Sequence, residues 1–219
     1  MPQQRGSRSR LTASDWAEAA LAAMREGGGL NAIAIEPIAT RLGATKGSFY
    51  WHFANREALV EAALARWERL RTEEVAAAVG PEPDPRARIR ELYHRVTRDA
   101  ARDPTELALL AHADHPRVAA VIKRVTTHRL DCLSRLFRDL GLSETEARYR
   151  GLQAYSGYLG RAHLAHSVPD LLPHGEDDRR YLDSVIDSLI GTHRPDADSG
   201  AGTDTGAGSG KGPAPGRDP

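Results

Sequence analysis

Apolar residues recur at helical spacing along most of the chain. The first set consists of Trp16, Ala20, Leu21 and Met24. Thr12, with Asp15 three residues later, forms a capping-box-like start in front of this set, and the glycines of Gly27–Gly29 end it. The pattern therefore predicts a first helix between Thr12 and Gly27.

Eight further helical segments are predicted from their start signals. In chain order they begin at or near Ile35, Thr45, Asn55, Pro85, Pro104, Pro116, Ser143 and Asp177. Thr, Asn and Ser cap helix starts, and proline is tolerated at the first helical position because its missing N–H has no partner there. Alternating Val, Ile and Thr runs and Asn-Gly hairpins are absent. The sequence therefore predicts an all-α fold of about nine helices.

Composition and charge exclude several classes of protein. The 219 residues hold 30 Lys and Arg against 30 Asp and Glu, which excludes a uniformly basic surface but not a local basic patch. No apolar run approaches the roughly 18 residues of a membrane helix, and the basic N-terminus lacks the apolar core of a signal peptide. Cys132 is the single cysteine, which excludes an intrachain disulfide. These features predict a cytoplasmic protein that makes no membrane contact.

The strongest functional signal lies in residues 34–53. Two short helices with the tight turn Leu42–Ala44 between them form a helix-turn-helix pattern. Phe49 and Phe53 stand four residues apart and are predicted to face inward. The predicted outward face of the second helix carries Lys46, Gly47, Ser48, Tyr50, Trp51 and His52. A surface helix without a binding partner rarely exposes Tyr, Trp and His together, so this face is predicted to bind.

DNA is the partner that these side chains fit. Lys46 can donate to guanine O6 and N7 or to a phosphate, and Ser48 can reach a base edge. Gly47 lets the backbone lie deep in the major groove, and Trp51 offers an apolar edge to a thymine methyl or a sugar. Tyr50 and His52 can donate to phosphates and fix the register. The full set of candidate DNA-binding residues is Thr45, Lys46, Gly47, Ser48, Tyr50, Trp51, His52 and Arg56, the last at a phosphate.

The stretch from Ile38–Ala39 through Leu42–Phe53 to Asn55–Leu59 resembles the signature of the TetR/AcrR family. The resemblance covers roughly residues 11–65, and the later helix order is similar as well. It implies a three-helix DNA-binding domain followed by a helical domain that binds a small ligand and dimerises. The domains predicted on this basis are a basic disordered arm at 1–10, the helix-turn-helix domain at 11–60, the ligand-binding and dimerisation domain at 61–192 and a disordered tail at 193–219.

One position departs from the family pattern. Ala34 stands directly before the second helix, where the family usually has Thr or Ser that caps the helix and contacts a phosphate. Loss of such a cap typically costs about 1 kcal/mol. Arg5, Arg8 and Arg10 are expected to compensate by reaching the minor groove, and a disordered arm that only aids solubility is the alternative.

A ligand cavity needs apolar walls with a few convergent polar groups. The candidates for this role are Trp67, Tyr93, His112, Tyr155, Tyr158 and Arg161, and for each of them core packing or an interface is the alternative. A ridge of mostly small residues (Ala147, Gly151, Ala154, Tyr158 and Ala162) allows close helix approach. The resemblance assigns a four-helix dimer interface to the segments 143–166 and 177–190, with internal packing as the alternative.

Two histidine groups could hold a metal ion. His112, Asp114 and His115 cluster at a helix junction, and His163 and His166 are three residues apart. Histidines near helix ends also bind carbonyls or are simply exposed, so we predict no metal and no cofactor. Cys132 lies on an apolar helix stripe and is predicted to be a buried structural thiol.

The predicted function is a repressor that binds a palindromic double-stranded operator as a dimer. Its two recognition helices would enter successive major grooves, and a small-molecule effector would release it. A DNA-bound activator is one alternative. An all-helical metal-dependent enzyme or sensor that uses the histidine and aspartate clusters is another, but no carboxylate pair, nucleophile–base set or phosphate loop stands at a meaningful spacing.

Overall fold

The computed structural model describes residues 11–27, 29–78 and 82–191. The predicted basic arm, with Arg5, Arg8 and Arg10, and the predicted tail from residue 193 lie outside the described residues. The described part contains nine α-helices and two short 3-10 helices and no strand, which confirms the all-α fold. The helices are α1 (Ala13–Gly27), η1 (Gly29–Ala32), α2 (Ile35–Arg41), α3 (Lys46–Phe49), α4 (Arg56–Ala78), α5 (Pro85–Ala100), α6 (Thr105–Leu110), α7 (Pro116–Asp139), α8 (Glu144–Ser167), η2 (Pro169–Leu171) and α9 (Gly175–Ile190).

Local capping chemistry sets most of the helix starts. The side chain of Thr45 accepts a hydrogen bond from the Ser48 N–H at 3.2 Å, and the Asn55 side chain accepts one from the Ala58 N–H at 2.9 Å. Ser143 begins α8 with a complete capping box. These predicted caps are confirmed.

Two predicted starts need correction. Pro104 is the residue before α6 and not its first residue, because the Asp103 carboxylate accepts a hydrogen bond from the Thr105 N–H at 3.0 Å and so opens the helix at Thr105. The last helix begins at Gly175, slightly before the predicted Asp177. Its acidic first turn matches the positive end of the helix dipole.

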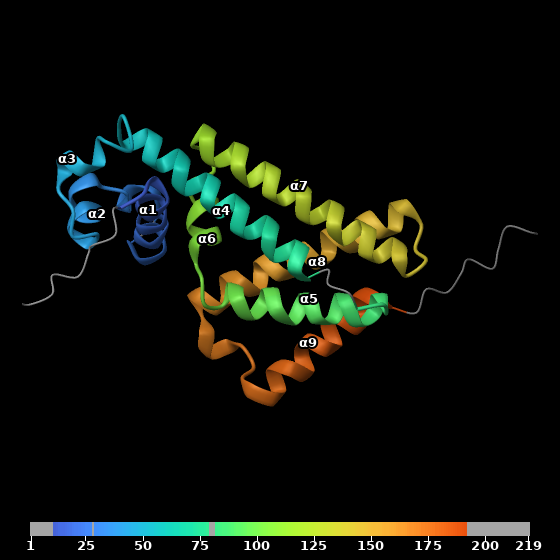
Figure 1. Ribbon diagram of the computed structural model, residues 1–219. Coiled ribbons are helices and arrows are strands. Elements are labelled where there is room, and N and C mark those ends of the chain that lie inside the picture. Colours follow the sequence, from blue (N-terminus) through green and yellow to red (C-terminus); the bar gives the residue numbers. More distant parts are fainter. Residues whose placement is uncertain (1–10, 28, 79–81, 192–219) are drawn as a thin grey trace, which may run out of the picture.

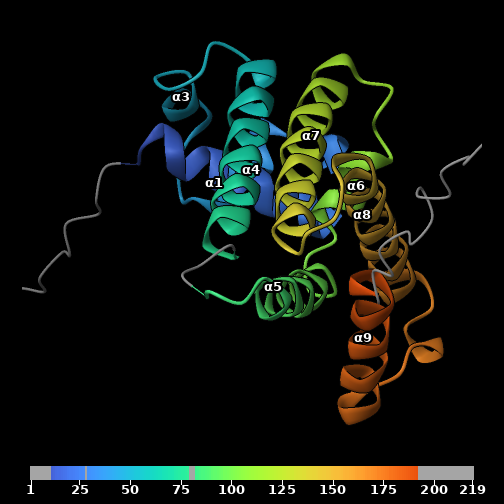
Figure 2. The same ribbon diagram turned by 90° about the vertical axis from the view of Figure 1, so that its right-hand side faces the viewer.

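The helices form an N-terminal bundle and a C-terminal body (Figure 1). The N-terminal bundle consists of α1–α3 with the first half of α4. The long helices α4 and α7 lie side by side and lead away from the bundle, and α8 returns along α7. Beneath them α5 crosses the body and packs on α9, and Figure 2 shows α8 and α9 together at one edge, away from α1 and α4.

Two apolar clusters hold these parts together. The first fills the N-terminal bundle and also takes in Leu109 of α6 and Val118, Val121 and Val125 of α7. The second lies in the C-terminal body and begins on α4 only at Val75. The first cluster therefore extends beyond the predicted domain limit at residue 60, and α4 and α7 each belong to both clusters. A shift in the body can thus reach the bundle through packed helices.

None of the described helices is both long enough and apolar enough to cross a bilayer.

Candidate functional site

The turn between α2 and α3 presents a short helix on the surface of the N-terminal bundle. Gly43 has a φ of +63°, a conformation that L-residues with a Cβ rarely adopt, and it lets the chain reverse at once. Phe49 of α3 is fully buried, with its ring 5.4 Å from that of Trp16 and 5.6 Å from that of Phe53. The predicted inward face is confirmed, and it fixes which side of α3 meets solvent.

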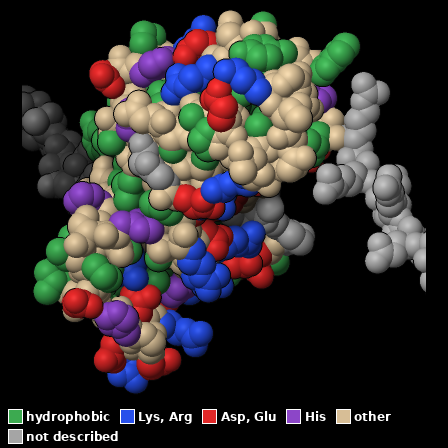
Figure 3. Space-filling view, turned by 90° about the vertical axis from the view of Figure 1, so that its left-hand side faces the viewer, with side chains coloured by type: hydrophobic (Ala, Val, Ile, Leu, Met, Phe, Trp, Pro, Cys, Tyr) green, Lys and Arg blue, Asp and Glu red, His purple; other side chains and the backbone are tan. Residues whose placement is uncertain are grey.

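The side opposite Phe49, formed by α3 and the turn at 50–52 that follows it, is open to solvent, and α3 itself ends at Phe49, before the predicted outward residues Tyr50, Trp51 and His52. Trp51 is 83% exposed and Tyr50 53% exposed, and Lys46 and Gly47 are exposed beside them. Figure 3 faces this end of the molecule, where hydrophobic, basic and histidine side chains lie close together near the top of the view. Thr45 is exposed as well, whereas Ser48 and His52 are half-buried. The structure thus gathers the predicted residues on one side of the turn.

Two of the predicted DNA-binding cations already have partners within the bundle. Lys46 pairs with Glu36 of α2 at 2.5 Å, and this contact raises the pKa of the Lys46 ammonium and lowers that of the Glu36 carboxyl. Both side chains are more than half exposed, so the pair is screened by water and easily exchanged.

Arg56 is held more firmly than Lys46. Its Nε donates to the Ile33 carbonyl at 2.7 Å, and one terminal nitrogen donates to the Leu30 carbonyl at 2.7 Å. The first turn of α4 is therefore tied to the segment between η1 and α2. Ala34 precedes α2 in an extended conformation without a side-chain cap, as the sequence predicts.

Comparison with known proteins agrees with this geometry. The family model for bacterial regulatory proteins of the TetR family matches residues 18–63, which include the whole turn between α2 and α3. Residues 18–63 therefore form a DNA-binding domain of the TetR type, with a helix-turn-helix. A comparison with curated proteins finds no match.

Solved structures extend the likeness to the whole fold. A transcriptional regulator from Rhodococcus sp. Rha1 superposes with a TM-score of 0.64 at 21% identity, over 82% of this chain and 94% of that one. A TetR-family transcriptional regulator from Streptomyces coelicolor gives a TM-score of 0.60 at 19% identity, over 81% of this chain and 95% of that one. At such identities the likeness concerns the fold.

A narrow, partly open cavity lies in the C-terminal body between α4, α5, α7 and α8. Its volume is about 50 Å³, and its walls are almost wholly apolar, with Ile89 and Leu92 from α5 and Leu133 from α7. Tyr93, Tyr155 and Tyr158, three of the six predicted ligand residues, line it. Since drug-sized ligands occupy roughly 300–1,000 Å³, a ligand of that size would have to open this cavity.

The other three predicted ligand residues lie elsewhere. Trp67 is 1% exposed within the core of the N-terminal bundle. The His112 ring bonds the Ala108 carbonyl at 2.8 Å and lies against Gly29, where an added Cβ would come within 2.5 Å of the ring. Arg161 pairs with Asp178 outside the cavity. None of the three is among the residues that line the cavity.

Four buried side chains at the cavity form what we call the buried quartet: Glu106, Arg129, Tyr155 and Tyr158. The Arg129 guanidinium donates to Glu106 at 2.6 Å, and the hydroxyls of Tyr155 and Tyr158 donate to the same carboxylate at 3.1 and 2.9 Å. Burial lowers the pKa of Arg129, but Glu106 and the two tyrosines raise it by more, so the guanidinium stays charged. Burial, and then repulsion from Glu106, raises the pKa of Tyr158 and keeps its phenol neutral.

The sequence reasoning did not find Glu106 and Arg129. A signal existed for Arg129, since it occupies the place in the apolar stripe of α7 between Val125 and Cys132 where an apolar residue is expected. A charged residue in phase with such a stripe must be buried with a partner. Glu106 gave no comparable signal, because acidic residues are common in the first turn of a helix.

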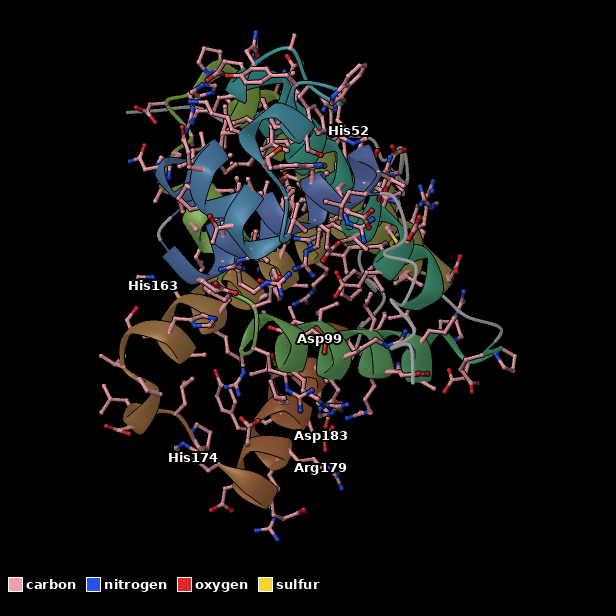
Figure 4. All side chains as sticks on the ribbon, turned by 60° about the vertical axis from the view of Figure 1, so that its left-hand side comes forward. His52, Asp99, His163, His174, Arg179 and Asp183 are labelled. Atoms are coloured by element: carbon pink, nitrogen blue, oxygen red, sulfur yellow. The ribbon has the colours of Figure 1, made fainter. Side chains whose placement is uncertain are left out.

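The histidines of the described part do not converge. His52 lies in the N-terminal bundle, whereas His163 and His174 belong to α8 and to the segment before α9 (Figure 4). His166 bonds the Ala100 carbonyl at 2.8 Å. Within residues 11–27, 29–78 and 82–191, no group of three His, Cys, Asp or Glu is placed to hold a metal ion. Cys132 is buried, as predicted, and burial raises the pKa of its thiol.

The predicted small-residue ridge of α8 lies inside the subunit. All five of its residues are buried, mainly against α7, and a Cβ added to Gly151 would come within 3.3 Å of Leu133. Its interpretation as a dimer surface is wrong, because the close helix approach that it allows occurs within one chain. The outward face of α8 carries other residues, among them the exposed Tyr149, Leu152 and Gly160.

Proposed function

We propose that this regulator is a repressor that binds a palindromic operator as a homodimer and leaves it when a small-molecule effector binds. The observation that carries the proposal is the outward side of α3 and of the turn after it, where Tyr50 and Trp51 are exposed close to Lys46 in the chain. Leaving two aromatic rings in water forgoes the free energy of burying them, and a DNA groove can supply that burial.

The proposed contacts divide into base and backbone contacts. Ser48 faces a base edge in the major groove, and Trp51 covers a thymine methyl or a sugar. Lys46, Tyr50 and His52 donate to phosphates. To reach DNA, Lys46 exchanges the Glu36 carboxylate for a phosphate, which is a small loss because that pair is exposed.

The helix starts on either side of these contacts have different proposed roles. Thr45 caps α3 from an exposed position beside the groove. For Arg56 the two carbonyl hydrogen bonds support a positioning role at the base of α4, in addition to or in place of the predicted phosphate contact.

The outward faces of α8 and α9 support the proposed dimer. Tyr149 and Leu152 of α8 are 64% and 53% exposed, and Tyr181 of α9 is 46% exposed. Large apolar side chains that remain exposed on a subunit are typical of an interface. A two-fold axis through this edge (Figure 2) would present two α3 helices, which must stand about 34–36 Å apart to enter successive major grooves.

Release follows from a conformational equilibrium. An effector that prefers a conformer with wrongly spaced α3 helices lowers the affinity for DNA, and DNA lowers the affinity for the effector by the same factor. α4 and α7 are suited to couple the two sites, because each contributes to both apolar clusters. Regulation is favoured over catalysis because the proteins with this fold named above are transcriptional regulators.

Operator selection tests the proposal. The full chain would be used to enrich binding sequences from random DNA duplexes. The affinity of the chain for the most enriched sequence would then be measured at two salt concentrations. We expect an inverted repeat with half-site centres about 10 base pairs apart or a multiple of this spacing. Lys46→Ala should reduce the salt slope by about two for a dimer.

Lys123→Ala is the matched control, since Lys123 is exposed on α7 and its loss changes the net charge equally. The control should keep the wild-type slope. No enriched sequence, or a Lys46→Ala slope equal to that of wild type, would contradict the proposal.

A further inference from the structure

The cavity of the C-terminal body is apolar except at one place. Among its described lining residues Arg129 alone is charged, and it is only 7% exposed. Glu106, which pairs with it, does not line the cavity. A molecule that enters therefore meets apolar walls and tyrosine rings, and the single buried cation lies directly behind them, over the rings of Tyr155 and Tyr158.

The carboxylate of Glu106 has little capacity for a further partner. One oxygen accepts from Arg129 and Tyr155, and the other accepts from Tyr158. The guanidinium of Arg129 has five N–H donors in a planar fork, a geometry that matches a second carboxylate. The cavity side of the quartet is thus suited to an anion, whereas a cationic ligand would meet Arg129 first.

The quartet is also connected to the N-terminal bundle. Glu106 belongs to α6, which packs on α1 and η1. Leu109 of the same helix is fully buried in the apolar cluster of the bundle. The Glu106–Arg129 pair is therefore a direct tie between the wall of the cavity and the helix that touches the bundle.

We propose that the effector is an amphiphilic carboxylic acid, with one apolar hydrocarbon body and one anionic head, whose carboxylate takes Arg129 from Glu106. This inference rests on the proposed function, because it treats the cavity as the effector site. The apolar body lies along residues such as Ile89, Leu92 and Leu133, and the head forms charge-assisted hydrogen bonds with the guanidinium.

Because its carboxylate replaces Glu106 at Arg129, the effector binds one conformer of the protein more tightly than the other. Glu106 without its countercharge is a buried anion held only by two phenols, which is unfavourable in an apolar site. The conformer in which α6 has moved away from α7 relieves this cost. A neutral apolar ligand would leave the Glu106–Arg129 pair intact and would not act on α6.

Three probes with the same eight-carbon chain test the head group: octanoate, 1-octanol and octylamine. Their binding to the full chain would be measured by calorimetry at neutral pH without DNA. We expect octanoate to bind at least about tenfold more tightly than 1-octanol, since hydrogen bonds to a charged group are the stronger ones. Octylamine should bind no better than the alcohol. Equal affinities, a preference for the amine, or no binding of any probe would overturn the proposal.

Variants of Glu106 and Arg129 test whether Glu106 competes with the effector for Arg129 or only stabilises the fold. Glu106→Gln removes the competing anion, so octanoate should bind this variant several-fold more tightly, whereas loss of a purely structural ion pair would not improve binding. Glu106→Gln combined with Arg129→Met removes both charges and leaves neither buried alone, and it should abolish the preference for octanoate over octanol. A preference retained in the double variant would overturn the proposal.

Arg161→Gln is the matched control, because Arg161 is paired outside the cavity. It should keep the wild-type preference for octanoate. The release step is measured separately, by adding octanoate to the operator complex. Octanoate that binds the free protein but leaves operator affinity unchanged would contradict the proposed release while upholding the effector class.

Discussion

Gly47 is a glycine that the packing of the subunit does not require. A Cβ added to this glycine meets only the Thr45 hydroxyl, at an ordinary 3.7 Å, so packing inside the bundle does not require glycine. Alanine is the better helix former by about 0.8–1.0 kcal/mol. A glycine in a four-residue helix thus forgoes stability, and close approach of DNA is the reason that we propose.

Gly47→Ala should therefore raise stability by several tenths of a kcal/mol and weaken operator binding by at least about tenfold. Urea unfolding and a DNA titration measure the two effects. Stability and affinity that rise together would show that no DNA group approaches this position.

For Arg56, in contrast to Gly47, we predict that replacement by alanine lowers stability. Its guanidinium satisfies two backbone carbonyls, and its side chain is 40% exposed, so Arg56→Ala should cost about 1–2 kcal/mol of unfolding free energy. Urea unfolding at fixed protein concentration measures this loss. Arg117→Ala is a suitable control, since Arg117 forms ion pairs with Glu57 and Glu61 at similar exposure. An unchanged urea midpoint with weaker DNA binding would mean that Arg56 acts only at a phosphate.

At the start of α6, the carboxylate of Asp103 forms hydrogen bonds and two ion pairs. Asp103 accepts from the Thr105 N–H and pairs with Arg71 of α4 at 2.7 Å and with Arg25 of α1 at 3.3 Å. Burial raises the pKa of Asp103, but the Thr105 hydrogen bonds and the two arginines lower it by more. One side chain therefore joins the start of α6 to α1 and to α4.

Asp103→Asn should lower the unfolding free energy at neutral pH by about 1–3 kcal/mol, because it removes the partner of two arginines. The folded-state pKa of Asp103 is lowered, so its contribution is present above the ordinary value of about 3.9 and is lost as the pH falls through the folded value. Urea curves of wild type and variant should converge in acid. A difference that persists below both pKa values would contradict this account, and the exposed Asp170→Asn serves as the control.

The two faces of α8 differ in what they contact, and this difference determines where the proposed dimer can form. One face packs on α7 inside the subunit, and the other carries Tyr149, Leu152 and Gly160 to the surface. A Cβ on Gly160 meets nothing within 4 Å, so a larger side chain there leaves the subunit undisturbed.

Gly160→Arg should convert the proposed dimer into a folded monomer and weaken operator binding by orders of magnitude, because each monomer reads only one half-site. Light scattering measures the oligomeric state, and circular dichroism measures folding. Ala120→Arg, at an exposed position on α7, should remain dimeric. A Gly160→Arg protein that stays dimeric would place the interface elsewhere.

The sequence alone was sufficient for the all-α fold, the helix starts at Thr45, Asn55 and Ser143, and the family of the helix-turn-helix. These features depend on interactions between residues a few positions apart: a cap and the N–H it satisfies, or apolar side chains at i and i+4. The inward position of Phe49 followed from the same short-range periodicity.

Only the tertiary structure decided which helices meet. It joined Glu106 to Arg129, turned the small-residue ridge of α8 toward α7, and placed Trp67 in the core of the N-terminal bundle away from the cavity. Periodicity identifies the apolar face of a helix but not the helix that covers it. The pairing of a buried charge likewise depends on a residue far along the chain, so these features followed from the packing of the complete molecule.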